Sequence, residues 1–524
     1  MRIGVDVGGT NTDAVLMEGS RVLAAAKSAT TADVVGGIVA SVTSVLADAK
    51  VEKTDVQSVM IGTTHFTNAL IERRRLSRVG VIRIGYPATT SIPPLFGWPK
   101  ALREQLGDHA VIVGGGYEYD GRLIAPLDEM AIANAARDFR SKAISSIAIS
   151  SVFAPLNRNM EDRAQEIVLN EVPGADVSLS ADFGRLGLLE RENATAINAS
   201  LVALAKHVIG AFGEALRSLQ ILAPFFISQN DGTLMTADYA VRHPALTFAS
   251  GLTNSIRGAA LLANLTNAVV VDVGGTTSDI GALQNGFPRE SAMTTDIGGV
   301  RTNFRMPDLI SLGIGGGSIV DVNAGATVGP RSVGFEISSR ALVFGGDTLT
   351  ATDLAVAGGL IDLGDRGRVQ HLDRKLVEAG LANIKSRVET AIDSIKLSAD
   401  PVPVVLVGGG SILLPDHMAG ASSVVRPRNY EVANAVGAAI AQAGGEVDRC
   451  YAYDDIGREA ALDEARSLAI ESAVAAGARR DTITITDIEE VALAYVPGRT
   501  TRLRVRAVGD MTFSPAPTGS GAGS

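Results

Sequence analysis

The chain has 524 residues, of which 46% are hydrophobic but only 4% aromatic, with 57 glycines and a formal net charge of −10. This length predicts about two to four domains, and the aliphatic, glycine-rich composition is typical of α/β sheets covered by helices. The negative charge argues against nucleic-acid binding, and so does the lack of any basic block longer than the short run Glu72–Arg75. We interpret that run as a solvated helix end.

The first half of the chain is predicted to alternate strands with helices. The first hairpin and a third strand cover residues 2–5, 14–17 and 22–26, and Asp33 is expected to open a helix over 33–49. Strands then follow at 57–62, 78–85, 144–152 and 225–228, and helices at 65–74, 128–140, 188–219 and 255–263. Residues 86–126 are rich in Pro, Gly and Tyr, so we expect an insert of loops and short strands that carries specificity.

The second half of the chain repeats this pattern. A second hairpin at 268–271 and 280–283 is followed by a helix at 373–397, a strand at 402–407 and a helix at 432–443. We therefore expect a first lobe over residues 1–266, a second lobe with a returning helix over 267–445, and a small C-terminal α/β appendix over 446–510. Residues 511–524 form a Ser/Pro/Gly/Ala tail that is predicted to be disordered.

The compartment is predicted from three simple features. The single cysteine, Cys450, excludes an intrachain disulfide and a cysteine-based metal cluster, and it is interpreted as an inert thiol. No apolar stretch is expected to be long enough to span a bilayer, and the N-terminus enters a strand instead of a signal-peptide region. We therefore expect a cytoplasmic protein without a membrane partner.

The most informative feature is a motif that occurs twice, as DVGGTNTD at Asp6–Asp13 and as DVGGTTSD at Asp272–Asp279. Each copy lies between two apolar runs, which predicts a strand, a Gly-Gly-Thr turn and a strand back. Glycines let backbone N–H groups approach a phosphate, and hydroxyl groups add donors. A tight hairpin without a ligand explains a single copy at least as well. Two copies at identical offsets favour a nucleoside triphosphate with a hydrated divalent cation between two lobes.

Each residue of the repeat receives a predicted role. Asp6 and Asp272 are expected to hold the hydration shell of Mg²⁺, and the candidate catalytic residues are Asp6, Asp13, Asp272 and Asp279. The candidate phosphate-binding residues are Gly8, Gly9, Thr10, Asn11, Thr12, Gly274, Gly275, Thr276 and Thr277. A further Gly-rich stretch, Gly315–Ser318, is either a second anion cradle through Gly315 and Gly316 or a turn between elements.

The order of these motifs resembles the actin-like ATPase superfamily, in which two ribonuclease-H-like lobes close on ATP. The loop that supports the adenosine in that superfamily matches Gly408, Gly409, Gly410 and Ser411, between a predicted strand and a predicted helix. The resemblance implies an α/β fold with two ribonuclease-H-like lobes around a nucleotide cleft, plus the small C-terminal appendix.

Within that superfamily, the chain resembles the hydantoinase/oxoprolinase A-subunit family over residues 1 to about 440. The resemblance depends on the segments Gly62–Arg73, Glu190–Thr195, Ser250-Gly251 and Gly313–Ser318. It implies ATP-dependent ring opening of a cyclic amide such as a hydantoin or 5-oxoproline, with Mg²⁺ and a separate B subunit; a homo-oligomer is left open. Two positions depart from the family pattern, since Leu252 replaces a common proline, and Ser311 and Leu312 stand where many relatives carry a histidine.

The chemistry that the resemblance implies agrees with the residues present. A carbonyl oxygen that attacks ATP carries no proton to remove, so positioning, Mg²⁺ and donors are needed more than a strong base. An alcohol kinase ordinarily needs an Asp near its substrate, and Asp13 or Asp279 keeps a sugar or acid kinase open. An ATP-driven reactivating chaperone is a third hypothesis.

Candidate substrate residues come from two of the family segments. Thr64, His65 and Asn68 start a predicted helix, and Thr64 and Asn68 share a helix face that we expect to border the cleft. His65 is alternatively a capping or partly buried residue. Glu190 and Arg191 form either an interior ion pair or substrate contacts.

Overall fold

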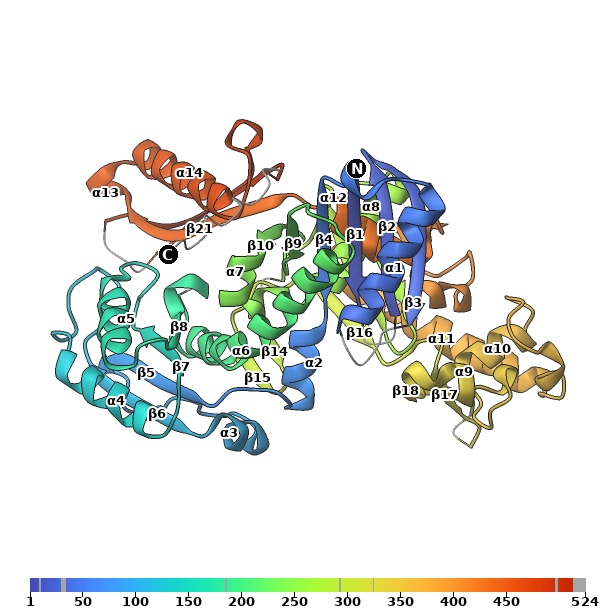
Figure 1. The fold of residues 1–524 in the computed structure, drawn as a ribbon, viewed down its shortest axis with the longest axis horizontal. Coiled ribbons are helices and arrows are strands. Elements are labelled where there is room, and N and C mark those ends of the chain that lie inside the picture. Colours follow the sequence, from blue (N-terminus) through green and yellow to red (C-terminus); the bar gives the residue numbers. More distant parts are fainter. Residues whose placement is uncertain are drawn as a thin grey trace, which may run out of the picture.

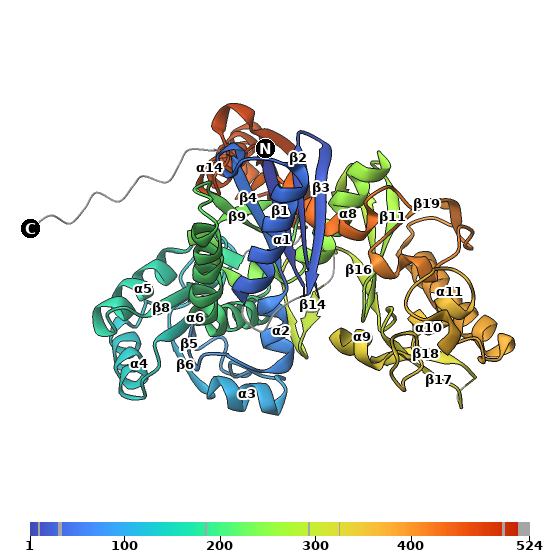
Figure 2. The same cartoon turned by 45° about the vertical axis from the view of Figure 1, so that its right-hand side comes forward.

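The computed structural model describes residues 1–8, 11–29, 34–183, 186–291, 294–323, 325–494 and 498–511. The predicted tail 511–524, apart from Met511, and the predicted helix opener Asp33 lie outside these ranges. The chain folds into two lobes, a small parallel sheet at the lower left of Figure 1, and a C-terminal sheet that lies above the small sheet in that view. Figure 2 shows the second lobe, with β11, β19 and α11, standing beside the first.

The first lobe contains part of a nine-stranded sheet in the order β22-β23-β21-β10-β9-β4-β1-β2-β3. Its own strands are β1 (Arg2–Val7), β2 (Asn11–Glu18), β3 (Arg21–Ala29), β4 (Ser58–Thr63), β9 (Phe225–Ser228) and β10 (Leu234–Thr236). Its helices are α1 (Val34–Ala49), α2 (His65–Glu72), α6 (Leu188–Ser218), α7 (Ala237–Arg242) and α8 (Ser250–Ala263). Strand β4 is buried along its whole length, because helices cover both faces of the sheet.

The second lobe is built on a six-stranded sheet that repeats the first hairpin. The order is β13-β12-β11-β19-β20, and β16 also pairs with β12. The strands are β11 (Ala268–Val273), β12 (Ser278–Gln284), β13 (Phe287–Pro288), β16 (Leu309–Leu312), β19 (Val402–Val407) and β20 (Ala421–Val425). A separate hairpin, β17 (Ser318–Asp321) and β18 (Thr327–Ser332), contacts the helices α10 (Ala351–Ala357) and α11 (Arg374–Ile395). The other helices of this half of the chain are α9 (Ile337–Arg340) and α12 (Ala433–Ile440).

The small parallel sheet has the order β6-β5-β7-β8, and all of its pairings are parallel. The strands are β5 (Val79–Tyr86), β6 (His109–Gly114), β7 (Ser146–Ser151) and β8 (Asp176–Leu179), with helices α3 (Lys100–Leu106), α4 (Glu129–Ser141) and α5 (Asn159–Glu171). The insert 86–126 therefore contains helix α3, which its Pro- and Gly-rich composition does not predict, and strand β6 as an integral edge of this sheet.

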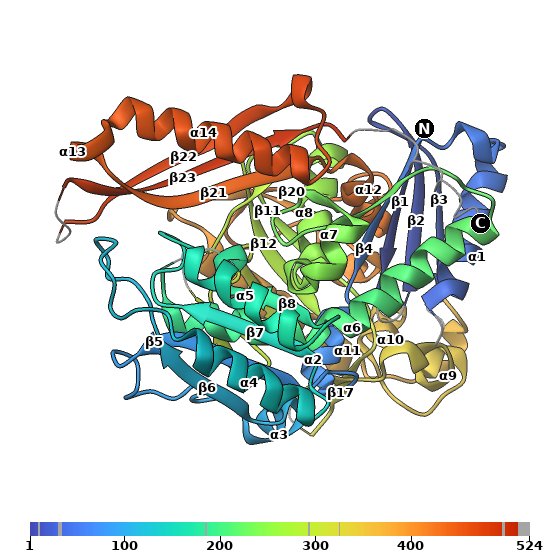
Figure 3. The ribbon, with the colours of Figure 1, turned by 60° about the vertical axis from the view of Figure 1, so that its left-hand side comes forward.

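The C-terminal segment extends the sheet of the first lobe. Strand β21 (Ala443–Ala452) pairs with β10, and β23 (Thr500–Gly509) and β22 (Thr484–Ala492) continue the sheet outward. Helices α13 (Tyr453–Ile456) and α14 (Arg458–Ala475) accompany these strands, and α14 covers one face. Figure 3 shows this unit lying above the small parallel sheet.

Two helices, α8 and α12, form the layer between the two main sheets. Alternate residues of β1 and β2, such as Ile3 and Leu16, face α1 and α6, whereas Val15 and Met17 face α12. In the second lobe, Val271 faces α10 and α11, and Val270 faces α8. The order of layers is therefore helices, sheet, α8 with α12, sheet, and helices.

Glycines allow α8 and α12 to cross closely. A Cβ on Gly258 would lie 1.8 Å from the carbonyl oxygen of Ala433, and a Cβ on Gly437 would lie 1.8 Å from that of Asn254. Gly4 of β1 faces α12 in the same way, with a virtual Cβ 2.0 Å from the oxygen of Ala435. Side chains at these positions would push apart the two helices that connect the lobes.

An arm of the second lobe is embedded in the first. Residues 289–308 leave the second sheet and form the hairpin β14 (Thr295–Ile297) and β15 (Val300–Thr302). Ile297, Val300 and Phe304 from this arm belong to the hydrophobic core of the first lobe. The lobes are therefore joined by the arm as well as by α8 and α12.

Helix α6 corrects one expectation about apolar segments. Its 31 residues contain an 18-residue window with a mean hydropathy of 1.4, so it passes the length and composition test for a membrane span. Core helices pass the same test, and 67% of that window is buried inside the protein. Among the described residues no other helix passes it.

Candidate nucleotide site

The two copies of the repeated motif form equivalent hairpins. Asp6 lies opposite Asp13 in the register of β1 and β2, and Asp272 lies opposite Asp279 in β11 and β12. The turn bonds also match, since Gly8 N–H donates to Asn11 at 3.0 Å and Gly274 N–H donates to Thr277 at 2.9 Å. Gly9 and Thr10 lie outside the described residues.

All four aspartates point into the layer between the two sheets. Because side chains alternate along a strand, Asp6 and Asp13 face α12, and Asp272 and Asp279 face α8. The Asn434 amide of α12 donates to Asp6 at 2.8 Å, and the Ser255 hydroxyl of α8 donates to Asp272 at 2.5 Å. The hairpins therefore converge from opposite lobes on one place.

The carboxylates repel one another there. Burial, together with the nearby negative charges of Asp13 and Asp272, raises the pKa of Asp6 to about 7. Burial, with a smaller contribution from Asp279, raises the pKa of Asp272 to about 6. The pKa values of Asp13 and Asp279 are also raised, mainly by burial. Lys27 pairs with Asp13 at 3.2 Å, which offsets only part of this negative charge.

The residues present fit a hydrated divalent cation. Within the described ranges, the buried oxygen Asp6 Oδ1 has no hydrogen-bond partner. The same ranges contain no group of three or more His, Cys, Asp or Glu residues arranged to hold a metal. Mg²⁺ in proteins usually keeps several waters and binds one or two carboxylates plus phosphate oxygens of the substrate. Two carboxylates, Asp6 and Asp272, without a full set of protein ligands, therefore fit a hydrated Mg²⁺.

The turn residues of the second hairpin are open to solvent. Gly275, Thr276 and Thr277 are exposed, and Gly274 is partly exposed. Among the described residues of the first hairpin, Gly8 and Asn11 are partly exposed and Thr12 is buried. Backbone and hydroxyl donors of the second turn are therefore accessible from solvent.

The loop Gly408–Ser411, which is predicted to support the adenosine, packs directly against the second hairpin. Gly408 has a φ of +79°, and a Cβ there would lie 2.3 Å from Asp272 Oδ1. Gly410 approaches Val273 and Gly274 equally closely, whereas Gly409 is exposed with no atom near its virtual Cβ. Ser411 is buried in the short turn Gly409–Leu413.

A groove of about 300 Å³ adjoins this loop. It is lined by Ala25, Ala26 and Lys27 of β3, by Gly409, and by Glu431 and Val432 before α12. The walls thus come from the first lobe and from the chain that returns from the second sheet. The loop predicted to support the adenosine faces a hollow that both lobes form.

The Gly-rich stretch Gly313–Ser318 has a structural role. Gly316 N–H donates to Gly274 at 3.0 Å, Gly317 N–H donates to Gly275 at 2.7 Å, and Gly315 N–H donates to Ser318 Oγ at 2.8 Å. Gly315 and Gly316 are buried, and a Cβ on Gly315 would lie 2.4 Å from the amide of Thr276. These amides already have acceptors, so the observed bonds favour a turn that supports the second hairpin over an anion cradle.

Helix α2 begins directly behind the first hairpin. The N–H of Thr64 donates to Val7 at 3.3 Å, and Asn68 Nδ2 donates to Thr64 Oγ1 at 3.4 Å, which places both residues on one face. A Cβ placed on Gly251 would lie 3.7 Å from the methyl group of Thr64. The segments Ser250-Gly251 and Gly62–Arg73 therefore meet here. His65 is partly buried beside Thr63 Oγ1 at 2.7 Å, and burial lowers its pKa.

The predicted ion pair between Glu190 and Arg191 is wrong. Glu190 instead lies 3.3 Å from Arg301 of the arm, and Arg191 is fully buried, where it donates to Ser180 and to the carbonyl oxygens of Leu186 and Ser151. Adjacent helix residues point in different directions, which explains the error. The buried pair of this region is Arg83 with Glu192, at 2.6 Å.

Several residues of the site carry no sequence signal. Asn434 contacts Asp6 across 428 positions, and Ser255 contacts Asp272 across 17. Asn254 also points toward Asp6, because the virtual Cβ of Gly62 lies within 2.6 Å of both side chains. Asn254, Ser255 and Asn434 are small polar residues on otherwise apolar helices, and that pattern could have marked them as candidates.

Comparison with known proteins bears on the family and the fold of the chain. Residues 2–172 match the model of the hydantoinase/oxoprolinase N-terminal region, and residues 191–395 match the hydantoinase/oxoprolinase model. The chain is 26% identical to the caprolactamase subunit alpha of Pseudomonas jessenii over 459 residues, covering 78% of this chain and 65% of that protein. It spans less than two thirds of the length of the curated relatives it matches first.

Two solved structures share the fold. The crystal structure of ATP-dependent caprolactamase from Pseudomonas jessenii superimposes with a TM-score of 0.74 at 20% identity, covering 98% of this chain and 88% of that one. The nucleotide-free structure of acetone carboxylase gives a TM-score of 0.69 at 17% identity, with the same coverage. The predicted α/β fold class is confirmed.

Proposed function

Because the chain belongs to the hydantoinase/oxoprolinase family, we propose that it uses ATP to phosphorylate the carbonyl oxygen of a cyclic amide. The substrate would be a compound such as a hydantoin or 5-oxoproline. The observation that carries the proposal is the convergence of two equivalent hairpins from opposite lobes, such that the negative charge of Asp272 helps to raise the pKa of Asp6.

The reaction follows from the chemistry of amides. Resonance with nitrogen makes the carbonyl carbon a poor electrophile. Transfer of the γ-phosphoryl group to the carbonyl oxygen releases ADP and gives an imidate phosphate. Water then adds to that carbon and the C–N bond of the ring breaks, which leaves an acyl phosphate. A second water hydrolyses the acyl phosphate to a carboxylate and inorganic phosphate, so one ATP and two waters are consumed for each ring opened.

Residues of this chain supply binding and positioning in the first step. Asp6 and Asp272 would hold the hydration shell of Mg²⁺, which neutralises charge on the phosphates. The exposed donors of Gly275, Thr276 and Thr277 would bind phosphate oxygens. Charge-assisted bonds of this kind contribute about 1.5–3 kcal/mol each, so four or five suffice for micromolar nucleotide affinity.

The substrate would enter beside helix α2. Thr64 and Asn68 share a face there, and Thr64 adjoins the end of β1, which leads into the first hairpin. His65 would stay neutral, because burial and the nearby Arg75 both disfavour its charged form. A neutral His65 adds no charge beside the amide group of the ring.

We further propose that the second step requires a partner subunit of the hydantoinase B type. The similarity to a protein named as subunit alpha of a caprolactamase supports this arrangement. Ring opening would then take place with both chains present.

The test is ADP release by the full chain, alone and co-purified with a co-expressed neighbour, with hydantoin, 5-oxoproline, ε-caprolactam, sugars, or acetone plus bicarbonate. The proposal predicts that a cyclic amide stimulates ADP release and that Asp6→Asn and Asp272→Asn abolish it. Asp400→Asn, at an exposed aspartate, is the matched control and should retain full turnover. Stimulation by sugars alone, by the ketone alone, or by a protein partner alone would contradict the proposal.

A further inference from the structure

A second hollow of about 540 Å³ lies far along the chain from the hairpins, between the small parallel sheet and the C-terminal sheet. Figure 3 shows these two sheets facing each other. The floor consists of Tyr119, Phe153, Leu156 and Leu186, and the roof consists of Cys450, Ala492, Leu493, Ala494 and Thr500. No lining residue belongs to the repeated motifs.

The floor occupies a position where α/β sheets bind ligands. Strand β5 lies in the interior of the small sheet; the chain passes to β6 on one side and then crosses to β7 on the other. Connections that leave a parallel sheet in opposite directions open a crevice at the carboxyl ends of the strands. Phe153 and Leu156 directly follow the carboxyl end of β7, so the hollow lies at this switch point.

The backbone at the floor is held in an unusual conformation. Phe153 has a φ of +54°, in the left-handed region that bulky residues rarely adopt. Hydrogen bonds from Leu156 N–H to Phe153 at 2.9 Å and from Tyr117 N–H to Val152 at 3.3 Å fix the turn around it. Such strain persists where the surroundings enforce it and is frequent at binding sites. The ring of Phe153 is therefore positioned by the turn.

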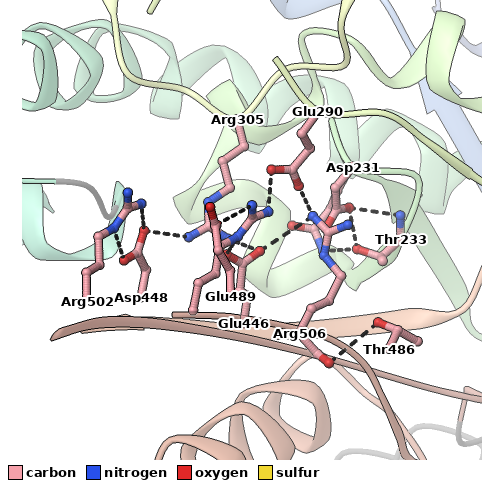
Figure 4. Close-up of polar contacts among 12 residues, drawn as sticks. Asp231, Thr233, Glu290, Arg305, Glu446, Asp448, Thr486, Glu489, Arg502 and Arg506 are labelled. Atoms are coloured by element: carbon pink, nitrogen blue, oxygen red, sulfur yellow. Dashed lines mark hydrogen bonds and ion pairs between the residues drawn. The ribbon is translucent and has the colours of Figure 1, made fainter. Parts of the chain in front are cut away.

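The roof is held in place by a network of ion pairs. On one face of the C-terminal sheet, Glu446, Asp448 and Cys450 of β21 lie opposite Arg506, Arg504 and Arg502 of β23. Figure 4 shows Glu290 and Arg305 of the arm reaching this face, where Glu290 pairs with Arg506 and Arg305 pairs with Glu446. Glu290 also pairs with Arg504. These ion pairs attach the C-terminal sheet to the arm.

The same face loses its charge where it covers the hollow. Arg502 is neutralised by a bidentate pair with Asp448, and beyond that pair the face continues with Cys450 and Thr500. The described lining contains no formally charged side chain. Burial and the neighbouring Asp448 raise the pKa of Cys450 to about 11, so the thiol is neutral at physiological pH. An ionic ligand would find no counter-charge here.

We propose that this hollow is a second binding site, distinct from the nucleotide cleft, for a neutral, mostly apolar small molecule that carries one or two hydrogen-bonding groups. Its volume is within the range of about 300–1,000 Å³ of small-molecule sites. The aromatic and leucine side chains bury the apolar part of the ligand, and Tyr119 and Cys450 offer polar contacts. The site is additional to the reaction proposed at the hairpins.

Cys450 provides a specific probe, because it is the only cysteine in the chain. The experiment measures the rate at which N-ethylmaleimide labels the full chain at about pH 8, by intact mass, with three probes of one shape: 3-phenylpropionamide, 3-phenylpropionate and 3-phenylpropylammonium. At four times its Kd the neutral amide should slow labelling about fivefold. The two ions, and separately Mg·ATP, should leave the rate unchanged.

Variants establish where the amide binds. Leu493→Trp and Ala494→Phe each place a larger side chain in the hollow, so either of them, once folded, should lose the protection. Leu222→Trp is the matched control at a leucine that is 87% exposed, and it should keep the protection. The proposal is overturned if the amide does not slow labelling, if the ions or Mg·ATP protect equally, or if both filled variants are still protected.

Discussion

Replacing Asp6 with asparagine should stabilise the nucleotide-free protein at alkaline pH, although it should abolish turnover. Burial, with the negative charges of Asp13 and Asp272, raises the pKa of Asp6 from 3.8 to about 7. One pKa unit corresponds to about 1.4 kcal/mol, so the ionised carboxylate destabilises the folded state by roughly 4 kcal/mol at most. Asparagine has no charge to bury and still offers an oxygen to the amide of Asn434.

The sign of the pH dependence follows from proton binding. The folded state holds the Asp6 proton more tightly than the unfolded state, so the wild-type protein loses stability as the pH rises from about 4 to about 7. About 2 kcal/mol of this loss falls between pH 5 and pH 7. The stability advantage of Asp6→Asn should therefore be less than half of its maximum at pH 5 and close to its maximum at pH 8.

The assay is urea denaturation of the wild type, Asp6→Asn and the control Asp400→Asn at both pH values, without nucleotide or divalent cations. The control should follow the wild type, because its carboxylate is exposed. We expect that the ionised Asp6 carboxylate destabilises the folded protein when no cation is bound. An Asp6→Asn variant that is less stable than the wild type at pH 8, or whose gain in stability does not grow with pH, would refute this expectation.

Three further substitutions test the geometry around the hairpins. Ser255→Ala removes the 2.5 Å donor that lowers the pKa of Asp272, so the acidic limb of the kcat/KM profile should move to higher pH; an unchanged profile would contradict this role. Gly437→Ala should destabilise the protein by about 1–3 kcal/mol or more, because its Cβ would meet Asn254, whereas Gly210→Ala, with open space around it, should be neutral or stabilising in thermal denaturation. Arg83→Ala leaves Glu192 buried without its ion-pair partner and should lower the free energy of unfolding by about 3–5 kcal/mol in urea denaturation. Arg103→Ala, in an exposed pair, should lower it by only about 0–1 kcal/mol. Similar losses for the two variants would contradict the importance of the buried pair.

The sequence predicts the hairpins well because all their information is local. Two copies of Asp-Val-Gly-Gly-Thr between apolar runs specify a strand, a turn and a strand back, and alternation along each strand then directs Asp6 and Asp272 to the same layer. The loop at Gly408 is equally readable, because a buried strand precedes it.

Contacts between distant segments are what the sequence does not reveal. Asn434 and Asp6 are 428 positions apart, and Arg83 and Glu192 are 109 apart, so no local pattern links them. The arm hairpin has strands of only three residues, which is too short for a periodicity to appear. Helix α8 begins at Ser250 instead of the predicted Ser255, because polar residues at its start are buried against the first lobe.

The most direct test of the central claim is the Mg²⁺-dependent affinity for a non-hydrolysable ATP analogue, measured by isothermal titration calorimetry on the wild type, Asp6→Asn and Asp272→Asn. If both lobes hold one metal-bound polyphosphate, Mg²⁺ should tighten binding in the wild type, and either substitution alone should remove most of that gain. Full Mg²⁺-dependent affinity in one of the two variants would show that its hairpin takes no part in binding.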